Sequence, residues 1–395
     1  MKKLVLGIML MLFLVGMFSM AFNIELVWAG PKTWIVDDDG PADFHTIAEA
    51  RLHAAPGDII YVKEGIYYER LYIYERNLTL IGENPRETVI DGNGTGFVIY
   101  VDGRTHGREK FFTISGFTIR NSGSEALLES GIFIDDASHC FIVGNIIAHN
   151  QQGILLYYSN NITVCGNIIK DSYAGVTSGK GIYLFHAHNN TIYNNNFINN
   201  TKDVLTYYSY NNTWNNNYLI GGNYWSEYTG TDLYMGPDQD ETGSDGIGDT
   251  PYVIDESNID NYPLMGYFSN FNVTSEFYVQ TICNSTITDF QFNGTAISFN
   301  VTGENGTTGF CRICIPTALM DVTYKVYVNG IEVSYDLLPC SNSTHSYLYF
   351  TYKHSTQKVI IIPEFPLNIA FLGFLMLITI PLIFIKKKHN QKIKS

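Results

Sequence analysis

The chain has 395 residues, of which 45% are hydrophobic and 16% are charged, whereas about 25% of the residues in a typical globular protein are charged. This composition excludes a disordered charged chain, because the apolar residues can bury a large core. The 38 acidic and 24 basic residues, a formal net charge of −14, argue against a general nucleic-acid binder, which needs a basic surface.

Residues 1–29 have the pattern of a signal peptide. Two lysines precede an apolar run from Leu4 to Phe22, and Val27-Trp28-Ala29 offers a cleavage site that ends in a small residue. We expect cleavage after Ala29. The alternative is an uncleaved anchor, because the apolar run is long for a leader.

A short helix is expected near the start of the exported chain, over residues 44–54. Asp43 is the predicted N-cap, and Phe44, Ile47 and Leu52 are available for burial. A solenoid needs a cover over its open end, so we assign this helix to that role.

An internal repeat organises residues 30–268. Copies of the pattern Ile-x-x-Asn-x-Ile recur at alternating spacings of 28 and 22 residues, each after a short Gly-Ile-x-Leu strand. Short strands at this spacing, with Asn stacked on Asn, indicate the turns of a right-handed parallel β-helix. Stacked side-chain amides satisfy one another along such a ladder. The predicted ladder consists of Asn145, Asn167, Asn195 and Asn217.

Residues 33–266 resemble the NosD-like, pectin-lyase-type β-helix proteins. The resemblance lies in the segment 58–69, in the Asn coils and in the run from Gly221 to Leu264, of which residues 243–254 are typical of archaeal members. It implies a right-handed parallel β-helix on an archaeal cell surface. The family takes its name from a periplasmic protein linked to copper-site maturation, so a copper-related role is one alternative. The residues argue against copper as a cofactor, because the exported part has no Met-rich or Cys/His cluster.

An aromatic stripe is expected on one outer face of the β-helix. In each Gly-Ile-x-Leu strand the third and fifth residues point outward, and coils stack about 4.8 Å apart. Sugar rings stack on such aromatic side chains, and the longer loops 122–129 and 171–180 could wall one side of a groove. The alternative is that another part of the chain covers the stripe. The carbohydrate-binding candidates are Phe133, Tyr157, Tyr183, Phe185 and Tyr207.

Catalysis on the coils has two candidate residues, the adjacent carboxylates Asp135 and Asp136. A β-helix lyase or glycoside hydrolase needs a carboxylate pair, or a carboxylate-bound metal with an Arg base. Neighbouring residues of a strand face opposite sides, and the pectinolytic signatures of the related families are missing. An enzyme of this class is therefore the alternative to a non-catalytic protein.

An acidic segment over residues 232–260 predicts a calcium site. Hard oxygen ligands on Gly-rich turns suit Ca²⁺, although the spacing is not that of an EF-hand. The alternative is a solvated acidic loop. The candidate ligands are Asp238, Asp240, Glu241, Asp245 and Asp249.

Residues 269–362 are predicted to form a β-sandwich-like module that holds four of the six cysteines. An oxidising exterior favours disulfides among them, with zinc at the Cys-x-x-Cys as an alternative. The candidates are Cys283, Cys311, Cys314 and Cys340.

Residues 363–395 have the pattern of a C-terminal anchor. Pro363-Glu364-Phe365-Pro366 precedes an apolar run of membrane-spanning length, Leu367 to Ile385, and a lysine-rich tail that we place in the cytoplasm. The arrangement resembles the archaeal PEF-type sorting signals, which implies processing by an archaeosortase-type enzyme; the alternative is a permanent anchor. The leader and the tail hold seven basic residues and one acidic residue, which leaves 17 basic and 37 acidic residues, a net charge of −20, on residues 30–366.

These observations predict an anchored, extracellular β-helix protein with a structural or adhesive role and a carbohydrate-binding stripe. Its expected partners are the membrane, surface polysaccharide and other envelope proteins, and not nucleic acid. Twelve Asn-x-Ser/Thr sequons in the exported part predict a glycoprotein.

Overall fold

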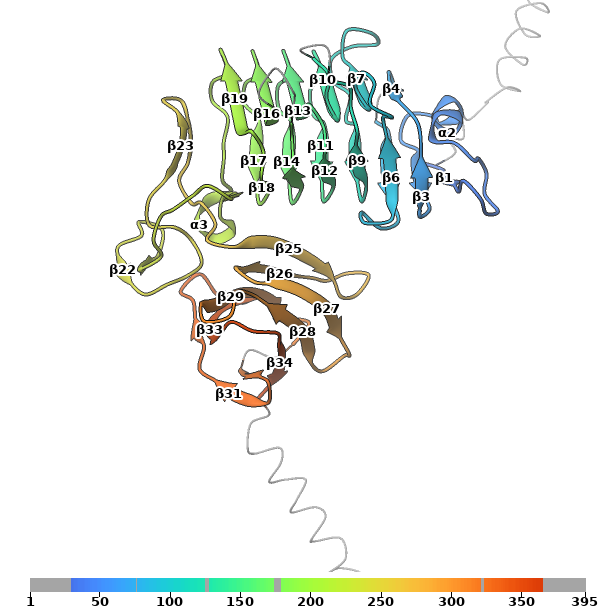
Figure 1. Cartoon of the computed structure of the whole chain (residues 1–395). Helices are drawn as coiled ribbons and strands as arrows, with labels where there is room; N and C mark the ends of the chain where they lie inside the picture. The colour runs from blue at the N-terminus through green and yellow to red at the C-terminus, as the bar shows by residue number, and fades with distance from the viewer. Residues whose placement is uncertain (1–29, 76, 125–127, 174–178, 321–322, 365–395) are drawn as a thin grey trace, which may run out of the picture.

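The computed structural model describes residues 30–75, 77–124, 128–173, 179–320 and 323–364. They form a parallel β-helix followed by a β-sandwich (Figure 1). The predicted signal peptide and the predicted C-terminal span both lie outside the described residues. Within the described ranges, no helix is long and apolar enough to cross a lipid bilayer.

Each turn of the β-helix adds one short strand to each of three parallel sheets. Sheet 1 consists of β1 (Thr33–Val36), β2 (Ile59–Val62), β5 (Thr79–Gly82), β8 (Thr113–Ser115), β11 (Phe141–Val143), β14 (Thr163–Cys165) and β17 (Thr191–Tyr193). Sheet 2 consists of β4 (Leu71–Ile73), β7 (Ile99–Asp102), β10 (Ile132–Asp135), β13 (Gln152–Tyr157), β16 (Lys180–Phe185) and β19 (Lys202–Tyr207). Sheet 3 consists of β3 (Gly65–Tyr67), β6 (Thr88–Asp91), β9 (Thr118–Arg120), β12 (Ile146–Ala148), β15 (Ile168–Lys170), β18 (Asn196–Ile198) and β20 (Tyr224–Trp225).

The core of the β-helix is a stack of aliphatic side chains. In sheet 1, Ile114, Ile142, Val164 and Ile192 stand in one column across four neighbouring strands, and all four are fully buried. Burying one such side chain contributes about 1.5–3 kcal/mol. A glycine is required at position 153, because a Cβ on Gly153 would lie 2.5 Å from the carbonyl oxygen of Gly181.

A buried asparagine ladder runs beside this core, and its last rung corrects the sequence prediction. The backbone N–H of Asn145 donates to Oδ1 of Asn167, and that of Asn167 donates to Oδ1 of Asn195. The N–H of Asn195 then donates to Oδ1 of Asn223 at 3.1 Å, so Asn223 is the fourth rung. Asn217 instead begins the short helix α3 (Asn217–Ile220). The last coil is therefore longer than the repeat spacing predicts.

The predicted N-terminal helix is present as α2 (Ile47–His53). Its N-cap is Thr46, whose hydroxyl accepts from the N–H of Glu49, rather than Asp43, whose carboxylate accepts from the N–H of Ile35 in β1. Glu69 adds a second cap, because its two carboxylate oxygens accept from the first N–H groups of the helix. The helix thus lies at the N-terminal end of the solenoid (Figure 1), as predicted.

Aromatic rings close the other end of the β-helix. Trp225 stacks on Phe197 with ring centroids 4.4 Å apart, and Tyr252 stacks on Trp225 at 4.3 Å. The fully buried Asp260 accepts from the N–H of Asn223 and from the indole of Trp225. Burial raises the pKa of Asp260 to about 7, against the lowering effect of these donors. Two hairpins supply the closing segment, β21 (Tyr234–Met235) with β22 (Glu241–Thr242), and β23 (Tyr252–Asp255) with β24 (Asn258–Asp260).

The predicted C-terminal module is a sandwich of two five-stranded antiparallel sheets with one shared core. The first sheet has the order β25 (Tyr267–Asn272), β26 (Tyr278–Cys283), β29 (Thr308–Pro316), β33 (His345–Lys353) and β32 (Asp336–Leu337). The second has the order β27 (Thr286–Phe292), β28 (Ile297–Thr302), β34 (Gln357–Pro363), β30 (Tyr324–Val328) and β31 (Ile331–Val333).

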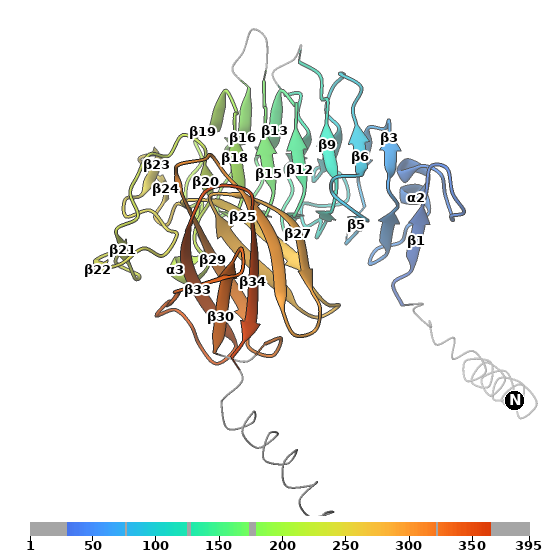
Figure 2. The same ribbon diagram turned by 60° about the horizontal axis from the view of Figure 1, so that its bottom comes forward.

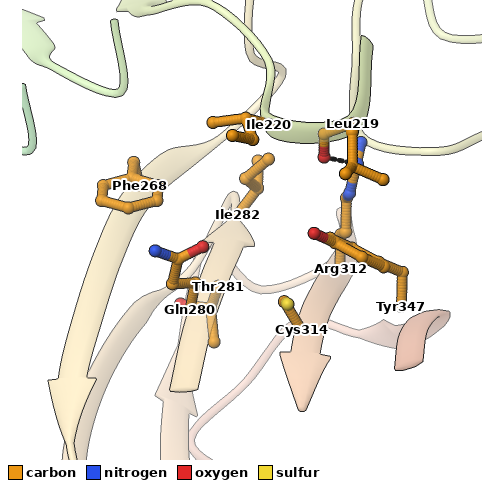
Figure 3. A pocket seen from close by; sticks show the side chains of 9 residues that line it. All are labelled: Leu219, Ile220, Phe268, Gln280, Thr281, Ile282, Arg312, Cys314 and Tyr347. Atoms are coloured by element: carbon orange, nitrogen blue, oxygen red, sulfur yellow. Dashed lines mark hydrogen bonds between the residues drawn. The ribbon is translucent and has the colours of Figure 1, made fainter. Parts of the chain in front are cut away.

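The sandwich packs against the C-terminal half of the β-helix (Figures 1 and 2). The side-chain amide of Asn196 in β18 donates to the carbonyl of Phe268 and accepts from its N–H, both at 2.8 Å. The guanidinium of Arg312 is buried and donates to the carbonyl oxygens of Leu219 (2.9 Å; Figure 3) and Asp245 (3.1 Å). The pocket between α3 and the sandwich in Figure 3 holds about 20 Å³, room for about one water molecule. This volume is far below the roughly 300 Å³ or more of a typical ligand pocket.

Candidate functional site

The predicted outward columns are aligned on sheet 2. One column runs through Phe133, Leu155, Tyr183 and Leu205 on neighbouring strands. The parallel column runs through Asp135, Tyr157, Phe185 and Tyr207. The register of the repeat was therefore read correctly for all eight positions, and the five candidate aromatic residues share one face.

The face extends beyond the sequence prediction in two directions. Tyr72 in β4 and Tyr100 in β7 continue the first column. The early coils lack the Gly-Ile-x-Leu pattern, so the repeat contains no signal for these two residues. A third column, Tyr158, His186 and Tyr208, follows the second at the ends of strands β13, β16 and β19, with ring stacking along it. We call these three columns the aromatic face.

Six rings of the aromatic face form two stacks, and the middle ring of each stack, Phe185 or His186, has both flat sides occupied. Tyr157 and Phe185 lie 4.8 Å apart with an angle of 10° between the rings, and Phe185 and Tyr207 lie 4.9 Å apart at the same angle. A ring in the middle of such a stack presents its edge outward. A ring at the end of a stack keeps one flat side for a ligand.

The C-terminal end of the stacks offers two such rings. β19 is the last strand of sheet 2, so no further strand of this sheet pairs with it beyond Tyr207. β23 lies beside β19, where Asp255 accepts from the hydroxyl of Thr206. Tyr207 is 47% exposed and Tyr208 is 56% exposed, and their rings meet edge to face at 4.5 Å. Phe133, in contrast, is only 5% exposed. The accessible part of the predicted stripe is thus concentrated at β19.

The other end of the aromatic face borders a polar pocket of about 360 Å³ that includes Tyr68, Arg70, Tyr72 and Asp91. Tyr68 is largely exposed. An aromatic ring beside an Arg and a carboxylate can stack on a sugar and hydrogen-bond its hydroxyl groups.

The sandwich does not cover the aromatic face. It contacts the β-helix through β18, through α3 and through Gly166 in the turn between β14 and β15, on the side away from sheet 2 (Figure 1). The two longer loops expected to wall the groove, 122–129 and 171–180, fall partly outside the described residues.

The two candidate catalytic carboxylates do not form a pair. Asp135 accepts from the hydroxyl of Tyr100 at 2.7 Å and from the guanidinium of Arg104 at 2.8 Å. Asp136, in a turn with positive φ, forms an ion pair with Arg108 instead. The strand neighbour of Asp135 is Asp102, which sequence reasoning missed.

Asp102 is held in its turn by several donors. Its carboxylate accepts from the Thr105 hydroxyl and from the N–H groups of Arg104 and Thr105. Burial alone would raise the pKa of Asp102, but these hydrogen bonds lower it overall. Asp102 is therefore ionised at neutral pH and shapes the loop that carries Arg104.

The five candidate calcium ligands are not brought together. Asp238, Asp240 and Glu241 are exposed, whereas Asp245 is fully buried. Asp245 accepts from the N–H of Ile247, and Asp249 accepts from backbone N–H groups of the β21 strand region. In the described part of the chain, the cluster of three carboxylates whose oxygens lie within 4.8 Å of one another is a different one, Asp37, Asp38 and Asp39.

The four candidate disulfide cysteines lie in two places, and all are free thiols in this structure. Cys283 and Cys311 stand opposite each other on β26 and β29, in the core of the sandwich. Cys314 and Cys340 belong to the apolar cluster between the sandwich and the β-helix. Cys311 and Cys314 of β29 therefore face opposite sides of their sheet.

The β-helix is similar in sequence to a known family. The model of the family "Periplasmic copper-binding protein (NosD)" matches residues 62–180 and 86–230. A probable pectinesterase/pectinesterase inhibitor of Arabidopsis thaliana is 30% identical over 132 residues, 32% of this chain and 25% of that protein. The chain thus spans a quarter of the length of this curated relative.

The solved structures that are similar to this protein have low TM-scores. Pectin methylesterase PemA from Erwinia chrysanthemi has a TM-score of 0.30 and 18% identity, over 42% of this chain and 66% of that one. The tailspike protein gp49 of Acinetobacter baumannii bacteriophage Fri1, a capsular polysaccharide depolymerase, has a TM-score of 0.26 and 10% identity, over 84% and 83%. Similarity at this level carries no argument about activity. The family match supports a relationship to NosD-type β-helix proteins.

Proposed function

We propose that this protein binds carbohydrate on its aromatic face and serves as a structural or adhesive protein of the cell surface. The observation that carries the proposal is the exposed pair Tyr207 and Tyr208 at the open end of two ring stacks. Aromatic side chains with an apolar body and a polar tip suit the ring face and the hydroxyl groups of a sugar.

The sequence supports the surface location in this proposal. The leader pattern, the PEF motif with its apolar run, and the lysine tail favour export and C-terminal anchoring, with a short cytoplasmic tail. The sequons of the β-helix at Asn77, Asn161 and Asn211 are exposed, so glycosylation would not disturb the core. Calcium remains a proposed ligand of the acidic surface, without an assigned set of residues.

A glycan array probed with the full-length protein in detergent tests the proposal. We expect binding that falls at least tenfold in a Tyr207→Ala, Tyr208→Ala double variant. The matched control is Tyr278→Ala, which removes a ring of similar exposure (50%) from β26 of the sandwich. Absence of binding to all glycans, or equal loss in the control, would contradict carbohydrate recognition by the aromatic face.

A carbohydrate lyase or hydrolase is the second candidate, favoured by one observation. Asp102 and Asp135 occupy equivalent positions on neighbouring strands, and Arg104 lies against Asp135 at the edge of the aromatic face. A carboxylate pair beside an Arg supplies groups for acid–base chemistry on a bound polysaccharide. Release of reducing or unsaturated ends from a polysaccharide panel, abolished by Asp135→Asn, would support it. Activity that survives this change would exclude Asp135.

A further inference from the structure

Two lysines occupy neighbouring positions at the edge of sheet 2. Lys180, the first residue of β16, is the register partner of Lys202, the first residue of β19. Adjacent strands lie about 4.8 Å apart, and like charges directly opposite each other destabilise a sheet. The preceding coil has the neutral Gln152 at this position. The two charges are therefore a departure from the repeat that has an energetic cost.

The ammonium group of Lys180 has no counter-ion in the part of the chain that the structure describes. Lys180 is only 8% exposed, and the ion pairs formed among the described residues include neither it nor Lys202. Burial, and then the charge of Lys202, lower the pKa of Lys180. A buried charge without a partner is costly, and this one lies in an exported region with a net charge of −20.

The nearby carboxyl group of Asp203 is not a counter-ion of Lys180. Asp203 takes a hydrogen bond from the side chain of Asn200 at 2.9 Å. Burial, and then the charge of Glu227, raise the pKa of Asp203 to about 6, against the lowering effect of the hydrogen bond from Asn200. Residues 174–178, which precede the strand, contain no acidic residue in the sequence. The pair of lysines is thus left open to an anion from outside.

The pair is part of the aromatic face. Nζ of Lys180 lies 5.9 Å from the ring centroid of Tyr183, a member of the first column. Tyr207, with its open side, lies on the same strand as Lys202, about 17 Å along it at about 3.3 Å per residue. A glycan of a few residues lying along β19 would reach from one to the other.

We propose that Lys180 and Lys202 form an oxyanion-binding site for a carboxylate or sulfate group of a glycan that lies on the aromatic face. This inference rests on the proposed function and names the ligand class: an anionic polysaccharide. Ammonium groups form charge-assisted hydrogen bonds with such oxygens, and the anion would compensate the charge that the fold leaves unpaired. Neither the repeat nor the family match assigns a role to these lysines.

Titrations of the full-length protein with three polymers test the site: hyaluronan for carboxylate, dextran sulfate for sulfate, and dextran as the neutral probe. We expect a Lys180→Met, Lys202→Met double variant to lose roughly tenfold or more in affinity for at least one anionic polymer, with binding of dextran unchanged. The affinity of the wild type should fall with added salt. Which of the two anionic polymers responds identifies the group that is bound.

Two controls separate binding from folding. Lys353→Met removes an exposed lysine of β33, remote from the aromatic face, and should change no affinity. Lys180→Met alone should raise the melting temperature, because it removes an unpaired buried charge, while it weakens anion binding. Lys180→Arg should retain binding.

The outcomes also separate the inference from the proposed function. Binding of dextran without any effect of the lysine variants would overturn the oxyanion site and leave the carbohydrate-binding proposal in place. Failure of the wild type to bind any polymer or any glycan of the array would overturn both.

Discussion

Asn167 and Asn195 form one rung of a buried ladder. The backbone N–H and the side-chain amide of Asn167 both donate to Oδ1 of Asn195, at 3.1 and 2.9 Å. The amide of Asn167 also donates to the carbonyl oxygens of Ile142 and Cys165. Each rung thus satisfies backbone groups of its own turn and of a neighbouring coil. The ladder fixes the coil register with polar contacts, while the aliphatic columns provide the hydrophobic free energy.

Removing one rung should be strongly destabilising. In Asn167→Ala, the buried backbone N–H of Asn145 loses its acceptor, and the carbonyl oxygens of Ile142 and Cys165 each lose the donor that the amide supplies, while that of Cys165 keeps the N–H of Gly144. A buried group left unsatisfied costs about 1–3 kcal/mol. We expect a loss of roughly 3–5 kcal/mol in the free energy of unfolding, measured by urea denaturation. Asn270→Ala, at an exposed position of β25, is the matched control and should change stability by less than about 0.5 kcal/mol. Similar effects of the two changes would contradict the structural role of the ladder.

The regular coils could be predicted from sequence because each position has one physical demand. Ile points inward, Asn fills the ladder, and the outward residues are free to vary, so the pattern sets the register of columns such as Phe133 with Tyr183. The fourth rung could not be predicted in this way. The segment Trp214–Leu219 matches the repeat pattern, but the chain forms α3 there. The fourth rung is therefore Asn223, 28 residues after Asn195.

The arrangement of the acidic segment could not be predicted for a related reason. Asp245 and Asp249 supply the oxygen atoms that Ca²⁺ prefers, but in the structure these atoms accept hydrogen bonds from backbone N–H groups. Composition does not distinguish a carboxylate that closes a turn from one that binds a metal. The aromatic face is a second example. The repeat predicted the positions of the rings correctly, but it could not predict that some of the rings stack on one another.

The position of the last rung gives a second prediction. Asn223→Ala should destabilise the protein by roughly 2–4 kcal/mol, because the amide of Asn223 donates to Ile192 and Trp214. Asn217→Gly, which retains the positive φ of 57° found at that position, should cost less than about 1 kcal/mol. Thermal denaturation of the two variants decides between the structure and the sequence prediction. A larger effect at Asn217 would favour the register read from the repeat.

Asp260 should make stability fall with rising pH. Burial raises its folded pKa to about 7, above the unfolded value of about 3.9. Its contribution to stability is therefore complete below about pH 4 and is lost as the pH rises toward 7, with a slope of at most about 1.4 kcal/mol for each pH unit. Asn does not titrate, so in Asp260→Asn the free energy of unfolding should depend less on pH between about pH 4 and 7.

Denaturation of the wild type and Asp260→Asn at pH 4, 5.5 and 7 measures the difference. Asp289→Asn is the control, because Asp289 is an exposed carboxylate on β27 of the sandwich. Parallel curves for the wild type and Asp260→Asn would show that Asp260 does not carry a raised pKa.

Arg312 should couple the unfolding of the sandwich to that of the β-helix. Its guanidinium reaches two carbonyl oxygens on the helix side, those of Leu219 and Asp245, and packs between the rings of Tyr218 and Tyr347. The single ammonium group of a lysine cannot donate to both carbonyl oxygens with the planar geometry of the guanidinium. In Arg312→Lys we expect the interface to weaken by roughly 2–3 kcal/mol. Scanning calorimetry should then show the sandwich melting at a lower temperature than the β-helix, whereas Arg86→Lys, an exposed control, should melt like the wild type. An unchanged transition in Arg312→Lys would mean that the apolar cluster and the Asn196–Phe268 contact hold the two parts together without the guanidinium.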